Sequence, residues 1–463
     1  MHIRHRHDVE DPRPEDDNVV AWERRYGIKE TVINITRMRV HARLKAGEGV
    51  SFVHYAHARH IDDPDPVMAV DGAGTISLHG LGEPVELRTH RPIELEPESC
   101  LTMESHESFP LTATTVAEVT DIPVKKIVPL ADGGIVVVAE AGSVRVMDVD
   151  GTTRWQVALA GPVHDADAGA NLIFVGHGDA SLTALQLTDG ATAWTYEIER
   201  IPSSCSWWEW PTPAAFRVAA AQPDSGFDGV VVGCGDIQMR RFDADGTCLW
   251  DYRYVNGIPG TIHLLDVNGD GVDEIIVGGE VMSNCSHGRV VDASGSQLQE
   301  FEIEGWTSRM TALAVAPGKP SYLAFGATRG RNLYFHQTDP TGAAPLQQRW
   351  MRRMPGAVTA IAIDRAAEFV VVGNTLGLVL IFDFAGDASG RAALPSPVQS
   401  VFVLSAGILV GLEDGSAHLL QRGDDGELDH VARWEVDAAW DRVAQTAEGL
   451  LIPTTGKILH LSL

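Results

Sequence analysis

One pattern of apolar and polar positions recurs along the chain from about residue 117 to the C-terminus. Each copy contains a β-branched segment, a glycine-containing turn, a second alternating segment, an Asp-Gly turn and often a closing tryptophan. Alternation of apolar and polar residues predicts strands with one buried face. Asp-Gly pairs supply the positive φ that tight hairpins need. The pattern therefore predicts many short antiparallel strands joined by tight turns.

A glycine that follows an apolar triplet gives the period of the repeat. Its spacings are 57, 45, 48, 47 and 38 residues, for Gly176, Gly233, Gly278, Gly326, Gly373 and Gly411. Periods of about 40–50 residues with four short strands each are typical of propeller blades. An unrelated β-sandwich with coincidental turns is the alternative, but it does not explain the repeated Asp-x-x-Gly-x-x-x-Trp ending. We therefore expect an all-β fold, a β-propeller of about eight blades.

The two ends of the repeat region suggest how the ring closes. The last copy, at residues 442–463, has three strands, and residues 109–117 are expected to supply the fourth and to hide the open edges. Residues 99–463 are thus assigned to the propeller. Residues 19–98 do not fit the repeat, and their alternating stretches predict a small β-sandwich-like domain. Residues 1–18 are predicted to be a disordered, charged tail.

The copies that end in tryptophan, such as Asp148–Trp155 and Asp245–Trp250, resemble the tryptophan-docking repeats of the quinoprotein-like, pyrroloquinoline-quinone (PQQ)-type propellers. That superfamily includes quinone-dependent dehydrogenases and outer-membrane assembly lipoproteins. The dehydrogenases hold a vicinal disulfide over the cofactor, whereas this chain has no adjacent cysteines. The lipoproteins carry a signal segment and a lipidated cysteine, which we do not find in this sequence. The resemblance therefore implies the propeller fold without a PQQ cofactor.

One copy contains the sequence HLLDVNGDGVDEIIVGG, which is similar to the calcium loops of FG-GAP repeats in integrin-like propellers. Calcium prefers six to eight oxygen ligands, so alternating carboxylate and amide side chains on a tight loop suit it. The expected ligands are the side chains of Asp266, Asn268, Asp270 and Glu274 and the carbonyl of Val272. The alternative is a turn in which these side chains only cap backbone amides. On the first interpretation, a structural calcium ion makes one blade more rigid.

A ligand site is expected where loops from several blades converge at the mouth of the propeller channel. The insertion 201–216 is rich in tryptophan, and dense aromatic residues stack on sugars or clamp side chains of a protein partner. A plug that seals the channel is the alternative. The candidate ligand-binding residues are Trp207, Trp208, Glu209, Trp210 and Trp306.

Candidate catalytic residues are His263, His287 and Arg309. Histidine and arginine beside an aromatic wall can bind an anionic sugar and abstract a proton, as a polysaccharide lyase does. His164 and His263 are expected at equivalent positions in the first strands of two blades. The alternative is that these residues line the channel and contact only water. A zinc site joining His287 to Cys205 and Cys285 is a further hypothesis, against the simpler reading of buried thiols and a loop histidine.

The chain carries 63 acidic and 36 basic residues, a formal net charge of −27. This charge repels phosphate backbones and anionic lipids, so neither nucleic acid nor a membrane is an expected partner. The N-terminal residues lack the apolar run of a secretory signal, which predicts a cytoplasmic protein and leaves secretion by another route open. We expect a non-catalytic propeller scaffold that binds a protein or another ligand. The alternative is a carbohydrate-active, polysaccharide lyase-like enzyme with its site at the channel mouth.

Overall fold

The computed structural model divides the chain into two compact units, Met1–Glu104 and Ser105–Leu463. It describes residues 112–118, 123–148, 150–201, 212–253, 257–281, 287–303, 310–327, 331–339, 345–423, 428–446 and 448–462, together with five short N-terminal strands. In the first unit, β1 (His2–Arg4) pairs with β2 (Asn34–Thr36), and β3 (Val67–Val70), β4 (Thr75–His79) and β5 (Val85–Arg88) form an antiparallel sheet. The tail and the β-sandwich expected in this unit fall largely outside the described residues and stay predictions.

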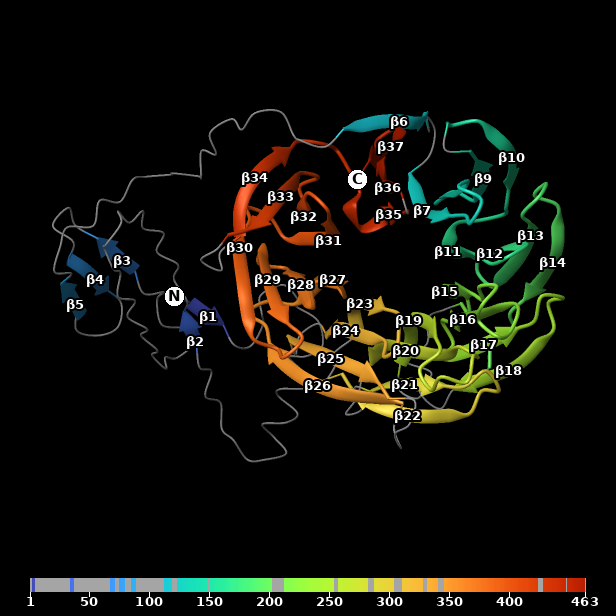
Figure 1. The fold of residues 1–463 in the computed structure, drawn as a ribbon, viewed down its shortest axis with the longest axis horizontal. Coiled ribbons are helices and arrows are strands. Elements are labelled where there is room, and N and C mark those ends of the chain that lie inside the picture. The colour runs from blue at the N-terminus through green and yellow to red at the C-terminus, as the bar shows by residue number, and fades with distance from the viewer. Residues whose placement is uncertain are drawn as a thin grey trace. The chain divides into compact units, whose positions relative to one another are not determined.

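The second unit is a ring of eight four-stranded antiparallel sheets, the blades, so the expected all-β propeller is confirmed (Figure 1). Blade 1 consists of β7 (Val124–Pro129), β8 (Ile135–Ala139), β9 (Ser143–Met147) and β10 (Thr153–Ala158). Blade 2 consists of β11 (Val163–Ala168), β12 (Leu172–His177), β13 (Ser181–Gln186) and β14 (Thr192–Glu197). Blade 3 consists of β15 (Ala215–Ala220), β16 (Val230–Cys234), β17 (Gln238–Phe242) and β18 (Cys248–Arg253). Blade 4 consists of β19 (Gly257–Leu265), β20 (Glu274–Val281), β21 (His287–Val291) and β22 (Gln297–Glu302).

The remaining blades continue in the same order around the ring. Blade 5 consists of β23 (Met310–Ala316), β24 (Tyr322–Ala327), β25 (Asn332–Thr338) and β26 (Leu346–Arg353). Blade 6 consists of β27 (Val358–Asp364), β28 (Phe369–Asn374), β29 (Leu378–Asp383) and β30 (Ala388–Ala393). Blade 7 consists of β31 (Val398–Leu404), β32 (Gly407–Leu412), β33 (Ala417–Arg422) and β34 (Leu428–Trp434), and the short helix η1 (Trp440–Arg442) leads into blade 8.

Blade 8 closes the ring with strands from both ends of the propeller sequence. Its first three strands are β35 (Ala444–Gln445), β36 (Gly449–Thr454) and β37 (Lys457–Ser462), and its fourth is β6 (Ala113–Glu118). β6 pairs with β37 in antiparallel register, with Ile458 opposite Ala117 (Figure 1). The closure expected from residues 109–117 is therefore confirmed, and the outer edge of the last three-stranded sheet is paired.

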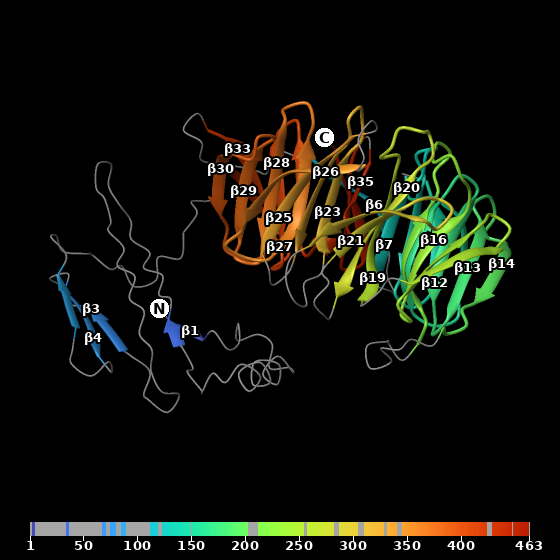
Figure 2. The ribbon, with the colours of Figure 1, turned by 90° about the horizontal axis from the view of Figure 1, so that it is seen from below.

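The strand order gives the ring two different faces (Figure 2). In blades 1 to 7 the chain runs from the innermost strand to the outermost, so all innermost strands run in the same direction. At one end of the ring, which we call the start face, the innermost strands begin and the second and third strands are joined. At the other end, the turn face, lie the turns between the first and second strands and between the third and fourth. No helix in the described part of the chain is long and apolar enough to cross a membrane.

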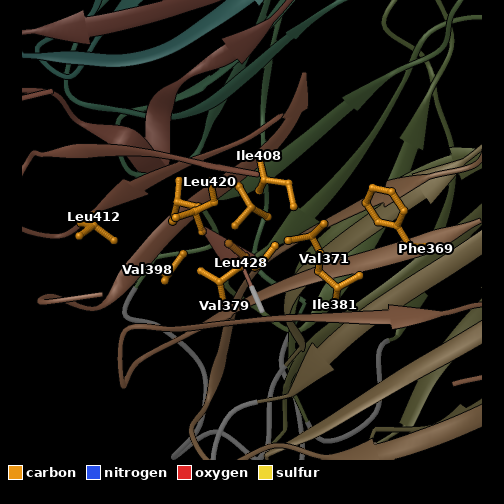
Figure 3. Close-up of a cluster of buried hydrophobic side chains, with 12 residues drawn as sticks. Phe369, Val371, Val379, Ile381, Val398, Ile408, Leu412, Leu420 and Leu428 are labelled. Atoms are coloured by element: carbon orange, nitrogen blue, oxygen red, sulfur yellow. The ribbon is translucent and has the colours of Figure 1, made fainter. Parts of the chain in front are cut away.

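The core lies between neighbouring blades. Between blades 6 and 7, side chains of β28 and β29 meet side chains of β31, β32 and β33, and most of them are fully buried (Figure 3). The periodic glycine lies on the second strand of a blade, where the first strand of the next blade packs against it. A Cβ atom at Gly373 would lie 2.2 Å from Cγ1 of Val398, and one at Gly326 would lie 2.3 Å from Cβ of Val358. The period read from the sequence is thus set by close approach between blades.

The repeated tryptophans join four of the blades to the blade that follows. In four blades, the indole Nε1–H donates to a carbonyl in the turn between the third and fourth strands of the following blade. These bonds are Trp155 to Leu187 at 2.9 Å, Trp194 to Ala244 at 2.8 Å, Trp250 to Ala293 at 3.0 Å and Trp350 to Phe384 at 3.1 Å. The glycine of the same turn, such as Gly246 with φ +87°, lies directly against the ring of Trp194. The repeated Asp-x-x-Gly and Trp positions are therefore the two halves of one interblade contact.

Candidate functional site

Several of the residues predicted to form a ligand or metal site lie outside the described residues. These are Trp207, Trp208, Glu209, Trp210, Trp306, Arg309, Cys205 and Cys285. The hypotheses that depend on them, namely the aromatic ligand platform, the arginine of a lyase-like site and the zinc site, stay predictions.

The two described catalytic candidates, His263 and His287, are not brought together. His287 is the first residue of β21, at the start face, and its Nδ1 lies 3.6 Å from Oε1 of Glu300. His263 lies two strands away on β19. It pairs with Ile276 of β20, which pairs in turn with Val290 of β21, three residues along that strand from His287. Three residues along a strand span about 10 Å, and two strand spacings add about 10 Å sideways. Burial lowers the pKa of His263, which keeps it neutral at pH 7.

The expected equivalence of His164 and His263 is wrong. A β-bulge lies between Val163 and Asp165 in blade 2, and the matching bulge lies between Pro259 and Thr261 in blade 4. These bulges align His164 with Gly260, so His263 lies three residues further along its strand. In the sequence the two strands could be aligned only by their apolar residues. Apolar residues alone do not show where a β-bulge lies, so the alignment was shifted.

The predicted calcium loop is the turn between β19 and β20, on the turn face. Asp266 accepts backbone N–H bonds from Gly269 at 2.6 Å and Gly271 at 3.0 Å, and Asp270 accepts one from Val272 at 2.8 Å. In the part of the chain that the structure describes, no three His, Cys, Asp or Glu side chains are grouped to hold a metal ion. In this conformation the loop side chains therefore cap backbone amides, as the alternative interpretation of the sequence had it.

Glu274 at the end of this loop is a buried carboxyl group, only 2% exposed. Its Oε2 accepts the N–H of Val267 at 2.9 Å and its Oε1 accepts an amide N–H of Asn268 at 2.6 Å. Burial, together with the nearby carboxylates of Asp270 and Asp266, raises the pKa of Glu274 to about 7 against the opposing effect of those hydrogen bonds. The loop thus carries four oxygen-bearing side chains, Asp266, Asn268, Asp270 and Glu274, whose chemistry suits a hard cation although they do not converge in this conformation.

A charged cluster on the innermost strands of blades 1 to 3 was not singled out from the sequence. Lys126 of β7 forms a 2.8 Å ion pair with Asp165 of β11. The second oxygen of Asp165 accepts the N–H of Val218 of β15 at 2.9 Å, and Asp167 accepts the N–H of Ala220 at 2.9 Å. Burial raises the pKa of Asp167, against the opposing effect of Lys126. These carboxylates connect three blades by capping the inner edge of β15.

Arg217 and Phe216 of β15 complete this cluster. Arg217 is exposed, and its guanidinium donates to the carbonyls of Gly260 in blade 4 and Phe216. The ring of Phe216 meets His164 edge to face with centroids 4.9 Å apart, and Nε2 of His164 lies 2.7 Å from the carbonyl of Gly178. One feature of the sequence could have revealed this cluster. Each of the three first strands, VKKIVP, VHDADA and AFRVAA, has a charged residue at its third position, where it interrupts the apolar pattern.

A buried ion pair between Arg240 and Asp236 stabilises blade 3. Arg240 forms a double hydrogen bond with Asp236, at 2.9 and 2.6 Å, and the side chains are 4% and 0% exposed. Burial alone would lower the pKa of Arg240, but its hydrogen bonds to Asp236 hold it above its ordinary value. Asp236 also accepts the N–H of Ile201 at 3.0 Å, and Arg240 donates to the carbonyl of Glu199 at 3.2 Å. The pair therefore fixes the segment that leaves blade 2.

The sequence was compared with known protein families and curated proteins. The family model described as outer membrane protein assembly factor BamB matches residues 108–254, which is less than half of the chain. No curated protein is similar enough to count as a match.

Solved structures were compared with the fold. BamB from Moraxella catarrhalis is similar, with 17% identity and a TM-score of 0.57 over 76% of this chain and 98% of that one. Sqt1 from Chaetomium thermophilum, solved bound to the N-terminus of ribosomal protein L10, has 13% identity and a TM-score of 0.57 over 76% and 100% of the two chains. The computationally designed Ika8 protein has 15% identity and a TM-score of 0.56 over 75% and 99%. At these identities the likeness shows the fold alone.

The family match places PQQ-type repeats in residues 108–254, and the described strands show that the chain forms an eight-bladed propeller. The resemblance drawn from the tryptophan endings is thereby confirmed at the level of the repeat and the fold. The match covers blades 1 to 3 and β6, which are the blades with the best-preserved Asp-x-x-Gly and Trp positions.

Proposed function

We propose that this protein is a non-catalytic propeller scaffold that binds a protein partner. The observation that carries the proposal is the likeness, over about three quarters of the chain, to a propeller solved with a bound protein segment. The closed ring supports it further. Tryptophan bonds and buried clusters join neighbouring blades, and a preorganised scaffold loses little entropy when a partner docks.

Sequence and geometry give less support to the carbohydrate-active alternative. Its two described histidines lie on different strands and at different levels of blade 4. Lys126, Asp165 and Asp167, on β7 and β11, are engaged in bonds between blades. A carbohydrate partner stays a prediction that rests on the tryptophan insertion.

The test is purification of the tagged full chain from the cells that make it, followed by separate production of the protein that accompanies it. We expect the two purified proteins to form a complex of fixed stoichiometry with a Kd of about a micromolar or tighter. The purified chain is also incubated with anionic polysaccharides. Failure to reconstitute any protein complex, together with release of unsaturated sugar products, would replace this proposal with the lyase-like alternative.

We also propose that the loop from Asp266 to Glu274 binds calcium as a structural ion. The support is its set of oxygen donors and the raised pKa of Glu274, because a cation would relieve repulsion among three carboxylates. Asp266, Asn268, Asp270 and Glu274 would hold the ion after turning from the backbone amides that they now cap. The ion would tie β19 to β20 and has no assigned part in chemistry.

The calcium proposal is tested by thermal unfolding with calcium and with excess chelator. Calcium at 100 times its Kd stabilises the folded state by about 2.7 kcal/mol. We expect chelator to lower the Tm, and Asp270→Ala to lower it and to abolish the response to calcium. Asp292→Ala, in the DASG turn between β21 and β22 on the same face of the blade, is the control that should keep the response. A Tm that ignores calcium in the parent protein would rule the site out.

A further inference from the structure

A cluster of cationic and aromatic side chains lies at the start face on the innermost strands of three adjacent blades, with Arg217 exposed and the others half-buried. It consists of Lys125 and Lys126 of β7, His164 of β11, and Phe216 and Arg217 of β15, and we call it the inner cationic cluster. Lys125, His164 and Phe216 are the bulged residues of their strands, so they lie at the same level around the ring. The three strands follow one another along the inside of the ring (Figure 1).

Arg217 is held in place by two backbone carbonyls. Its Nε–H donates to the carbonyl of Gly260, and its Nη1 donates to the carbonyl of Phe216 at 2.8 Å. Within the described residues no carboxylate pairs with Arg217 or with Lys125, although the chain as a whole has 27 more acidic than basic residues. A guanidinium that is already oriented loses little entropy when it binds an anion.

The carboxylates near the cluster are already engaged in bonds within the ring. Asp165 is 9% exposed and divides its oxygens between Lys126 and the backbone of β15. Asp167 accepts backbone N–H bonds from Ala168 and Ala220, both at 2.9 Å. The positive charges that no carboxylate of the described residues balances at this position are therefore those of Lys125 and Arg217, beside the packed rings of Phe216 and His164.

The surroundings of Arg217 define what kind of anion would fit. Phe216 is half-buried, and Ile262 and Leu264 are half-buried on β19, the strand that anchors Arg217. A ligand with both an acidic and an apolar part would match these neighbours. A polyanion such as nucleic acid would meet the field of a chain of net charge −27, whereas one or two carboxylates on a peptide meet little of it.

We propose that the inner cationic cluster binds a segment of a protein partner that carries a carboxylate next to apolar side chains. The inference rests on the proposed protein-binding function and specifies its partner. Arg217 pairs with the carboxylate through its planar fork of N–H groups, Lys125 adds charge, and Phe216 packs against the neighbouring apolar side chain.

The experiment exposes the immobilised full chain to a display library of random dodecapeptides. We expect the selected peptides to be enriched in Asp or Glu beside Leu, Ile or Phe. A synthetic copy of a selected peptide is then titrated by fluorescence anisotropy. Hydrogen bonds to charged groups contribute about 1.5–3 kcal/mol, so Arg217→Ala should weaken binding about ten- to hundredfold. Arg391→Ala, an exposed arginine on the outermost strand of blade 6, should leave it unchanged.

A second variant separates binding from folding. Arg217→Ala removes the bond to Gly260, so its Tm is measured beside its affinity. Lys125→Glu removes no bond of the described residues and reverses one charge, and we expect it to weaken the peptide with little change in Tm.

Three other outcomes would contradict the proposed peptide specificity. Selected peptides without acidic enrichment, or with affinity that ignores both variants, would overturn the inference while leaving a protein-binding function. Selected basic peptides would point instead to the Asp-Gly turns of the turn face. A library that yields no binder would overturn the inference alone if a partner protein is reconstituted, and would count against the proposed function as well if none is.

Discussion

His336 makes the stability of the ring depend on acidity in a way that can be calculated. It lies on β25 of blade 5 and is 3% exposed; its ring stacks on Phe325 with centroids 5.2 Å apart and meets the tilted ring of Phe301 of blade 4 at 5.8 Å. Its Nδ1 has no hydrogen-bond partner in the described part of the chain. Burial among these rings lowers the pKa of His336 to about 4, from an ordinary value of 6.5. The folded protein therefore holds this imidazole neutral where the unfolded chain protonates it.

The sign and size of the effect follow from this difference. Because the folded-state pKa is lowered, the unfolded state binds more protons between pH 6.5 and pH 4, and stability falls as the pH drops through that window. A shift of about 2.5 units corresponds to about 3 kcal/mol, fully lost only below pH 4. His336→Phe keeps an aromatic ring in the stack and removes the titration. Its free energy of unfolding relative to the parent should therefore rise by about 3 kcal/mol between pH 7 and pH 4.

The measurement is urea unfolding of both proteins at several pH values across this window. The quantity to follow is how the difference in unfolding free energy between the two proteins changes with pH, because any strain from the larger Phe ring is the same at every pH. Phe335→Leu, a core change without a titrating group, is the control and should give a difference that does not vary with pH. If the parent and His336→Phe lose stability in parallel on acidification, His336 is not a buried neutral histidine and the reasoning is wrong.

Three further predictions concern the ring. Trp194→Ala should lower the free energy of unfolding by about 3 kcal/mol, since it removes a half-buried indole and its bond to Ala244, and an unchanged urea midpoint would refute the interblade lock. A chain that begins at residue 105 should unfold cooperatively, whereas one that begins at 119 lacks β6 and should melt lower; equal Tm values would contradict closure by β6. Arg240→Ala should cost about 3–5 kcal/mol by leaving Asp236 buried without its partner, and adding Asp236→Ala should recover part of that loss in a double-mutant cycle.

Much of the fold was determined by the sequence itself. Alternating residues fix which face of a strand is buried, and Asp-Gly pairs fix the turns, so a repeat of four strands is visible without coordinates. The period is visible because Gly373 and its counterparts stand where a Cβ atom would collide with the next blade. Closure by residues near 113 was predictable since the last copy lacked a strand and an unpaired edge is unfavourable.

The candidate sites depended on tertiary structure. Lys126, Asp165 and Arg217 are far apart in the sequence, and only the ring brings their strands side by side. His263 and His287 are closer in sequence, yet the register of β19, β20 and β21 separates them. Sequence repeats reflect contacts that every blade makes, so they reveal the architecture. A binding site arises where the side chains of one blade differ from those of its neighbours. Strand register and β-bulges decide which of these side chains lie at the same level of the ring, and neither can be read from the repeats.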